Sequence, residues 1–189
     1  YLITYYYFIK NNTRKELSIK DGFTIVSLAW LTMSIFSALP YYISIDDFSY
    51  TNSFFEAMSG LTTTGATILG SSTLLIEELS HGLLFWRSFT QFIGGMGIIV
   101  FSIAILPLLG IGGVQLFKAE VAGPSTDKIT PRIKQTAKLL WIIYIGLILF
   151  LMLLFYIQGM TFFDSICHSF TTISTAGFST HSESINFFK

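Results

Sequence analysis

The chain has 189 residues and no net charge at pH 7, and only 12% of its residues are charged while 52% are hydrophobic. With a mean hydropathy of +0.64, this composition excludes an ordinary soluble domain and indicates an all-α integral membrane protein. The lone cysteine excludes a disulfide within the chain, and the basic segments lack the interleaved aromatic residues of a nucleic-acid site. We therefore expect contact with membrane lipid and none with nucleic acid.

Three uncharged segments are long enough to cross the hydrocarbon core, which needs roughly 20 helical residues. They are residues 23–45, 88–117 and 139–163. Residues 1–9 are also apolar but too short to span. We interpret residues 1–21 as the end of a preceding helix followed by a cytoplasmic loop.

Two polar loops of related sequence interrupt this pattern. The first reads Thr62-Thr63-Thr64-Gly65-Ala66-Thr67, and the second follows 112 positions later as Ser174-Thr175-Ala176-Gly177-Phe178-Ser179. Each loop follows a short stretch that opens on a Phe-Phe-acid triplet, at residues 54–56 and 162–164. Helices this short enter the membrane and turn back, and irregular backbone at that depth is tolerated where it is buried in protein or lines water.

The loops define an internal repeat of membrane helix, short pore helix, filter loop and membrane helix. We expect these elements at residues 22–45, 53–61, 62–67 and 81–109 in the first repeat, and at residues 136–158, 162–172 and 174–180 in the second. The first repeat thus covers residues 22–110, a cytoplasmic linker covers 111–135, and the second covers 136–189, truncated before its last helix. Glu56 precedes Gly65 by nine residues and Asp164 precedes Gly177 by thirteen, which predicts about one extra turn in the second pore helix.

The placement of charge predicts which loops face which side, because Lys and Arg in short loops remain cytoplasmic. Basic residues concentrate before the first span and between the second and third, whereas residues 44–83 contain five acids and no Lys or Arg. We expect both basic segments inside and both filter loops outside. The basic residues are Lys10, Arg14, Lys15 and Lys20, then Lys118, Lys128, Arg132, Lys134 and Lys138.

The loop composition suits the dehydration of a cation, since a selectivity filter replaces the hydration shell with rings of oxygens. Gly65 and Gly177 can adopt positive φ without steric cost, which lets consecutive carbonyl groups point the same way. Each pore helix also ends with its partial negative pole toward the loop, and we expect Glu56 and Asp164 near the positive poles at the helix starts. The candidate ion ligands are Thr63, Thr64, Gly65 and Ala66 in the first loop, and Thr175, Ala176, Gly177 and Phe178 in the second.

Further motifs extend the pattern along nearly the whole chain. They are Ser59-Gly60-Leu61 before the first loop, Phe85-Trp86-Arg87-Ser88, Gln91-Phe92-Ile93-Gly94-Gly95-Met96-Gly97, Ile105-Leu106-Pro107-Leu108-Leu109, Lys118-Ala119-Glu120, Gly123-Pro124, Thr130-Pro131-Arg132, Gln135-Thr136-Ala137-Lys138, Asp164-Ser165-Ile166-Cys167-His168 and Ala176-Gly177-Phe178-Ser179-Thr180. In these residues the chain resembles the membrane subunit of the Trk/Ktr/HKT potassium transporters, and is most similar to the bacterial TrkH branch.

This resemblance implies four pore-loop units around one pore per subunit, a homodimer in the bacterial cytoplasmic membrane, and potassium uptake under the control of a cytoplasmic, TrkA-like nucleotide-binding subunit. It implies no cofactor beyond potassium as the transported ion. In related plant transporters, serine at the first filter glycine accompanies sodium permeation, so Gly65 and Gly177 resemble the potassium-selective pattern. A sodium-permeable or sodium-coupled relative remains the alternative, because the third and fourth filters decide it.

Three other features have competing interpretations. Cys167, His168 and His181 lack the paired spacing of metal ligands, which argues against a metal site. An intramembrane enzyme that used either histidine would need a second polar catalytic residue, which the predicted spans do not offer. A membrane protein that binds a partner without conducting ions is a further alternative. Arg87 either extends its head group to the membrane surface, which we favour, or donates to a pore-loop carbonyl. The glycines at 94, 95 and 97 favour close helix packing, so Gly95→Leu should damage assembly and Gly95→Ala should be milder.

Overall fold

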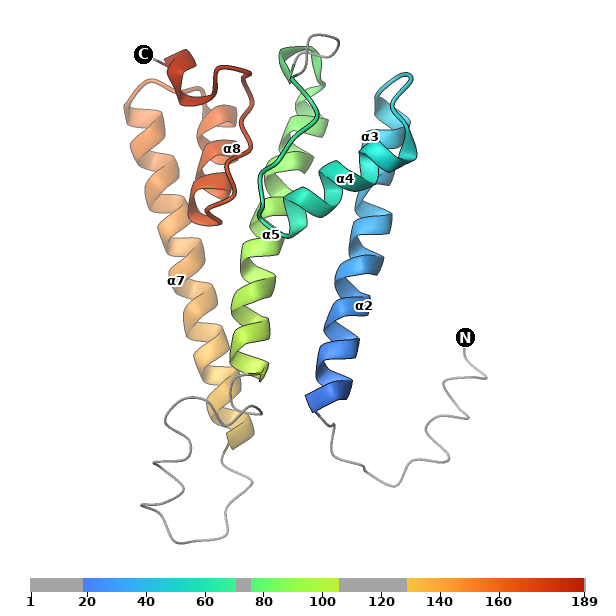
Figure 1. The fold of residues 1–189 in the computed structure, drawn as a ribbon. Coiled ribbons are helices and arrows are strands. Elements are labelled where there is room, and N and C mark those ends of the chain that lie inside the picture. The colour runs from blue at the N-terminus through green and yellow to red at the C-terminus, as the bar shows by residue number, and fades with distance from the viewer. Residues whose placement is uncertain (1–18, 71–75, 106–128, 189) are drawn as a thin grey trace, which may run out of the picture.

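The computed structural model describes residues 19–70, 76–105 and 129–188, and every regular element in these ranges is helical (Figure 1). Three long helices stand side by side: α2 (Ile19–Ser37), α5 (His81–Ile105) and α7 (Ile129–Ile157). The short helices α4 (Tyr50–Leu61) and α8 (Phe162–Ile173) lie beside α5 at the upper end of the view, with α3 (Leu39–Ser44) leading from α2 toward α4. Two 3-10 helices, η1 (Ile76–Glu78) and η3 (Ser184–Phe188), lie at that same end. The predicted helix end at 1–9 and the linker residues 111–128 fall outside the described ranges.

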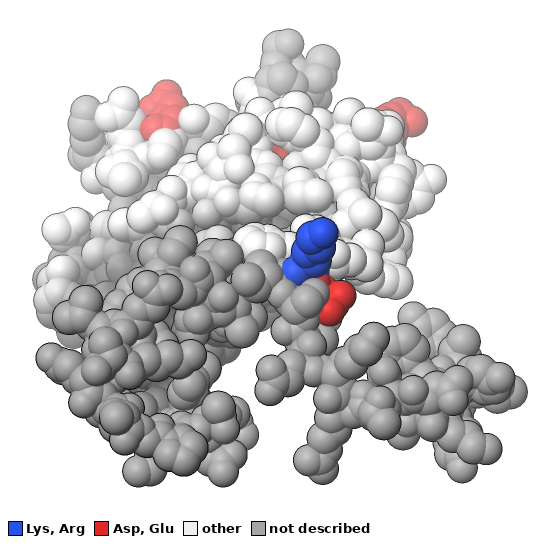
Figure 2. Space-filling view, turned by 60° about the horizontal axis from the view of Figure 1, so that its bottom comes forward, with Lys and Arg blue, Asp and Glu red and all other residues white. Residues whose placement is uncertain are grey.

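Within the described ranges, two helical segments are long and apolar enough to cross a membrane, Lys20–Ser44 and Gln135–Ile157. Their outward side chains are apolar, and Leu28, Ile142 and Phe150 keep 57%, 58% and 60% of their surface exposed. Charged side chains are few on the described surface in Figure 2. Both properties fit contact with lipid chains.

Residues 88–105 of the middle predicted span lie on α5, which differs from the other two long helices, and residues 106–117 fall outside the described ranges. The 25 described residues of α5 reach about 37 Å, enough to cross the hydrocarbon core. Its first half nevertheless buries Arg87, Ser88, Thr90 and Gln91 inside the protein. The polarity of α5 follows from its central place between the two short helices and their loops.

Helices α2, α4 and α7 are each helical before the residue at which the sequence predicted them to begin. Helix α4 starts at Tyr50 and not at Ser53, because the Ser49 side chain caps it by accepting a hydrogen bond from the Asn52 N–H group (3.2 Å). Helix α7 is already helical at Ile129, the first described residue of this range, whereas the sequence predicted a start near residue 136.

The two short helices have equal length, so the predicted extra turn in the second is wrong. Each has 12 residues, and a shift of 112 positions superposes their capping pattern. The Thr64 N–H group donates to the Ser59 carbonyl at 3.0 Å, and the Ala176 N–H group donates to the Thr171 carbonyl at 3.0 Å. The error arose from pairing Glu56 with Asp164: in the structural register Glu56 corresponds to His168.

The paired loops after the two short helices

The backbone of each loop is left-handed at two alternate residues. In the first loop φ is 54° at Thr63 and 73° at Gly65, and in the second it is 58° at Thr175 and 97° at Gly177. Glycine adopts this region freely, whereas a β-branched threonine is strained there by roughly 1–2 kcal/mol. The glycines were predicted for this reason, but the threonines were not, because threonine has no preference for positive φ.

The two loops touch through their backbones. A β-carbon placed on Gly65 would collide with the carbonyl group of Ala176, whereas one placed on Gly177 would meet nothing within 4 Å. Gly177 borders a half-open cavity of about 240 Å³ that Thr171 and Thr175 also line. The sequence-predicted ligands thus lie on two adjacent loops that meet at Gly65, and the second loop borders open space.

Glu56 holds the return of the first loop. Its carboxylate is fully buried and accepts hydrogen bonds from the Thr67 hydroxyl (2.6 Å) and the N–H groups of Ile68 (2.6 Å) and Leu69 (3.3 Å). The predicted place near the start of the helix is wrong, because α4 begins six residues earlier, at Tyr50. The Ser59 hydroxyl adds a bond to the carbonyl of Ala66 (2.6 Å).

Asp164 binds the end of the second loop, as Glu56 binds the end of the first, but it lies one helical turn earlier in its helix than Glu56 does. It lies in the first turn of α8, as predicted, and accepts hydrogen bonds from the Thr180 hydroxyl (2.7 Å) and the Thr161 hydroxyl (2.6 Å). His168 occupies the position equivalent to Glu56, with its Nε2 atom 3.3 Å from the Thr180 hydroxyl. Each loop is therefore tied back to the short helix that precedes it, by different residues.

Arg87 does not extend to the surface, which corrects the interpretation that the sequence favoured. Its side chain is 1% exposed and donates to the carbonyl of Ser179 (3.0 Å) and to the hydroxyl of Thr67 (3.1 Å). Its guanidinium lies 3.8 Å from the Glu56 carboxylate and 4.3 Å from the centre of the Phe178 ring. The alternative, donation to a pore-loop carbonyl, is what the structure contains.

One turn further along α5, Gln91 also holds the second loop. Its side-chain oxygen accepts a hydrogen bond from the Phe178 N–H group (3.3 Å). Arg87 and Gln91 thus engage adjacent backbone groups of that loop, the N–H of Phe178 and the carbonyl of Ser179. Gln91 stands in one of the motifs that carry the resemblance, but no sequence pattern predicted this contact, because its partner lies 87 residues away.

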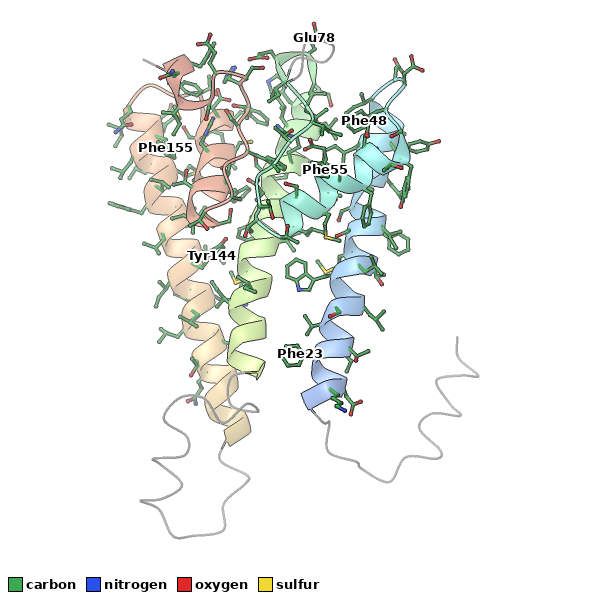
Figure 3. The ribbon with its side chains drawn as sticks, in the orientation of Figure 1. Phe23, Phe48, Phe55, Glu78, Tyr144 and Phe155 are labelled. Atoms are coloured by element: carbon green, nitrogen blue, oxygen red, sulfur yellow. The ribbon has the colours of Figure 1, made fainter. Side chains whose placement is uncertain are left out.

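The glycines of α5 permit close packing at the base of both loops, as predicted. A β-carbon on Gly94 would collide with the backbone carbonyl of Leu61, and one on Gly95 would lie 2.5 Å from the Tyr144 hydroxyl and 2.9 Å from the Ser174 β-carbon. Tyr144, labelled in Figure 3, donates from α7 to the Phe92 carbonyl on α5 (3.4 Å). The C-terminal ends of α4 and α8 therefore pack against glycines of α5.

A further contact joins the two repeats at the loop end of the molecule. The Glu77 carboxylate accepts hydrogen bonds from the N–H group and the hydroxyl of Ser182, both at 2.7 Å. The Ser182 N–H group, followed by its hydroxyl, lowers the pKa of Glu77 below its ordinary value. The repeats are therefore connected here through Gly65, Arg87, Gln91 and Glu77.

Comparison with known proteins agrees with this architecture. Residues 3–189 match the family model TrkH, described as cation transport protein. The chain is 48% identical to the Trk system potassium uptake protein TrkH of Vibrio parahaemolyticus, over 96% of this chain and 37% of that protein, and 49% identical to its Escherichia coli K12 counterpart, over 92% and 35%. The crystal structure of the potassium transporter TrkH from Vibrio parahaemolyticus superposes with a TM-score of 0.73 and 46% identity, covering 90% of this chain and 33% of that one.

The chain thus spans about a third of the length of these relatives. Membership of a transport family argues against the enzyme alternative built on His168 or His181. The match over nearly the whole chain, together with the shared helical structure, shows that the chain belongs to the TrkH family of cation transport proteins.

Proposed function

We propose that this chain supplies two of the potassium-coordinating loops of a pore through which potassium ions enter the cell. The observation that carries this proposal is the geometry at the two glycines, where two loops of equal register meet and each has left-handed residues at alternate positions. Such alternation aims neighbouring carbonyl groups toward one side, which an ion needs when it exchanges its water shell for protein oxygens. The relatives named potassium uptake proteins support potassium as the ion.

The carbonyl groups of Thr63, Thr64 and Gly65, and of Thr175, Ala176 and Gly177, are the proposed ligands. Ala66 and Phe178 border them, and the Ala66 carbonyl has a protein partner in the Ser59 hydroxyl (2.6 Å), which makes it the weaker candidate. The C-terminal ends of α4 and α8 point their partial negative charge at the loops and favour a cation.

We place the chain in the bacterial cytoplasmic membrane, with both loops facing outside. The absence of Lys and Arg from residues 44–83 supports this orientation. The proposed partners are a second copy of the complete subunit and a cytoplasmic, TrkA-like nucleotide-binding subunit, both implied by the resemblance to Trk transporters. No cofactor is proposed, since potassium is the cargo.

Serine at the filter glycines tests this proposal in the complete protein, expressed in a host that lacks its own potassium uptake. Gly177→Ser decides most clearly, because the new side chain has space and disturbs chiefly the positive φ. We expect the ratio of potassium to sodium uptake to fall about tenfold, since one disturbed layer of oxygens changes the difference between two binding free energies.

Thr24→Ser on α2 is the matched control, because it retains the hydroxyl that donates to the Lys20 carbonyl far from the loops. Its ratio should equal that of the wild type. If Gly177→Ser reaches the membrane and keeps the wild-type ratio, the second loop does not select potassium and the proposal fails.

A further inference from the structure

One guanidinium group contacts the same position in both repeats. Thr67 and Ser179 are 112 residues apart, as are the two filter glycines, and Arg87 donates to both. Its partner is the hydroxyl in the first repeat and the backbone carbonyl in the second. Arg87 itself belongs to α5, the closing helix of the first repeat, so its bond to Ser179 crosses between repeats.

The chemistry of arginine suits this double contact. Its planar fork presents several N–H donors in fixed directions, whereas the ammonium group of lysine is a single compact charge. Here the Nη1 atom of Arg87 donates to the second loop at 3.0 Å and the Nη2 atom donates to the first loop at 3.1 Å. One rigid group therefore fixes the separation between two loops.

The surroundings of Arg87 hold it in place. The Glu56 carboxylate, 3.8 Å away, supplies the opposite charge and also binds the Thr67 hydroxyl that Arg87 contacts. The Phe178 ring lies beneath the guanidinium at 4.3 Å, a cation–π distance. All three side chains are almost completely buried, and so is the acceptor Ser179, whereas the acceptor Thr67 is exposed.

We propose that Arg87 is a positioning residue that sets the spacing of the two filter loops and thereby the selectivity for potassium. This inference rests on the proposed function of the loops. A selectivity filter coordinates an ion with oxygen atoms from several loops at once, so the spacing between the loops matters as much as the conformation of each loop. Glu56 is the counter-charge that keeps the guanidinium aimed at Thr67 and Ser179.

Two variants distinguish a role of Arg87 in positioning the loops from a role in neutralising the charge of Glu56. Arg87→Lys keeps a positive charge opposite Glu56 but removes the fork. The double variant Arg87→Gln, Glu56→Gln removes both charges together, so neither is left buried without its partner, while the amide at 56 still offers an oxygen to the first loop. Ser88→Ala is the matched control, because Ser88 is buried beside Arg87 and donates to the Leu84 carbonyl of its own helix (3.3 Å).

The experiment measures potassium and sodium uptake by the complete protein, normalised to the amount in the membrane. We expect Arg87→Lys and the double variant to lower the potassium-to-sodium ratio about tenfold and to raise the apparent KM for potassium, with Ser88→Ala unchanged. A purely structural role would lower the amount of protein and the maximal rate, and would leave the KM and the ratio per molecule unchanged.

Wild-type ratios in both variants would overturn the inference, and so would the absence of both from the membrane, which would assign Arg87 to folding. Either result, obtained beside a wild type that takes up potassium selectively, leaves the proposed function intact. A wild type without potassium uptake would remove the proposed function itself.

Discussion

Gly65 lies directly against the carbonyl group of Ala176, which brings the loops of the two repeats into backbone contact. The contact requires a residue without a side chain on one loop and an uncovered carbonyl on the other. Gly177, at the equivalent position, faces open space instead. Two glycines with the same backbone role therefore have different surroundings.

Alanine substitutions should reveal this difference. At Gly177 alanine faces only the cost of positive φ, about 1–2 kcal/mol, whereas at Gly65 it must also displace Ala176. We expect Gly65→Ala to lower the Tm and the yield of folded protein more than Gly177→Ala does. Thermal unfolding of the purified complete protein measures the Tm of each variant. A larger decrease in Tm for Gly177→Ala than for Gly65→Ala would contradict the loop contact.

The packing at Gly95 predicts a cost even for alanine, the substitution expected to be milder than leucine. The added β-carbon would lie 2.5 Å from the Tyr144 hydroxyl and 2.9 Å from the Ser174 β-carbon, so α7 or the second loop must shift. We expect Gly95→Ala to cost about 1–3 kcal/mol, as overpacking does. Adding Tyr144→Phe removes the nearer atom and should recover part of the loss.

Gly146 on α7 provides the control for that comparison. A β-carbon there meets nothing within 4 Å, and alanine is the better helix former by roughly 0.5–1 kcal/mol. Gly146→Ala should therefore keep or raise the Tm. Equal Tm values for Gly95→Ala and Gly146→Ala would show that close packing at Gly95 is unimportant.

The bond between Glu77 and Ser182 predicts a pH dependence. The Ser182 N–H group lowers the pKa of Glu77 in the folded state, so this contact stabilises the fold above the unfolded-state pKa and is lost as pH falls through the folded-state pKa. The effect should be small because Glu77 is exposed and screened by water. The Tm of the wild type should thus decline more than that of Glu77→Gln between neutral pH and about pH 3.

Glu78, labelled at the loop end in Figure 3, is the matched neighbour for this test. Glu78→Gln should retain the acid sensitivity of the wild type, because the bonds to Ser182 come from Glu77. Identical pH profiles for the wild type and Glu77→Gln would rule out this link between the repeats.

The proposed orientation is open to chemical labelling. Single cysteines replacing Glu78 and Lys20, in a background where Cys167 is alanine, should react differently with a membrane-impermeant thiol reagent applied to intact cells. The cysteine at 78 should be labelled and the one at 20 protected, because charge placement puts them on opposite sides. Labelling at position 20 would reverse the topology and place the loops inside.

The sequence by itself determined the features that depend on local composition. The long apolar segments fixed the membrane class, and the recurrence of Gly65 as Gly177 after 112 residues revealed the repeat. The need for positive φ at both glycines also followed, because the loop chemistry restricts the residue type there. The assignment of these loops to potassium, and the boundaries of the two repeats, remain predictions.

Only the tertiary structure decided which residues hold the loops. Matching the Phe-Phe-acid triplets paired Glu56 with Asp164, whereas helix capping by Ser49 and Thr161 pairs Glu56 with His168. The place of Arg87 also depended on the fold, since its two loop contacts lie 20 residues before it and 92 residues after it in the chain. An arginine near a helix end meets water if that end faces the surface, and meets buried acceptors if other helices cover it. Here α4, α8 and their loops surround this part of α5. Arg87 is therefore buried and contacts the loops of both repeats, although its position near a helix end predicted a surface residue.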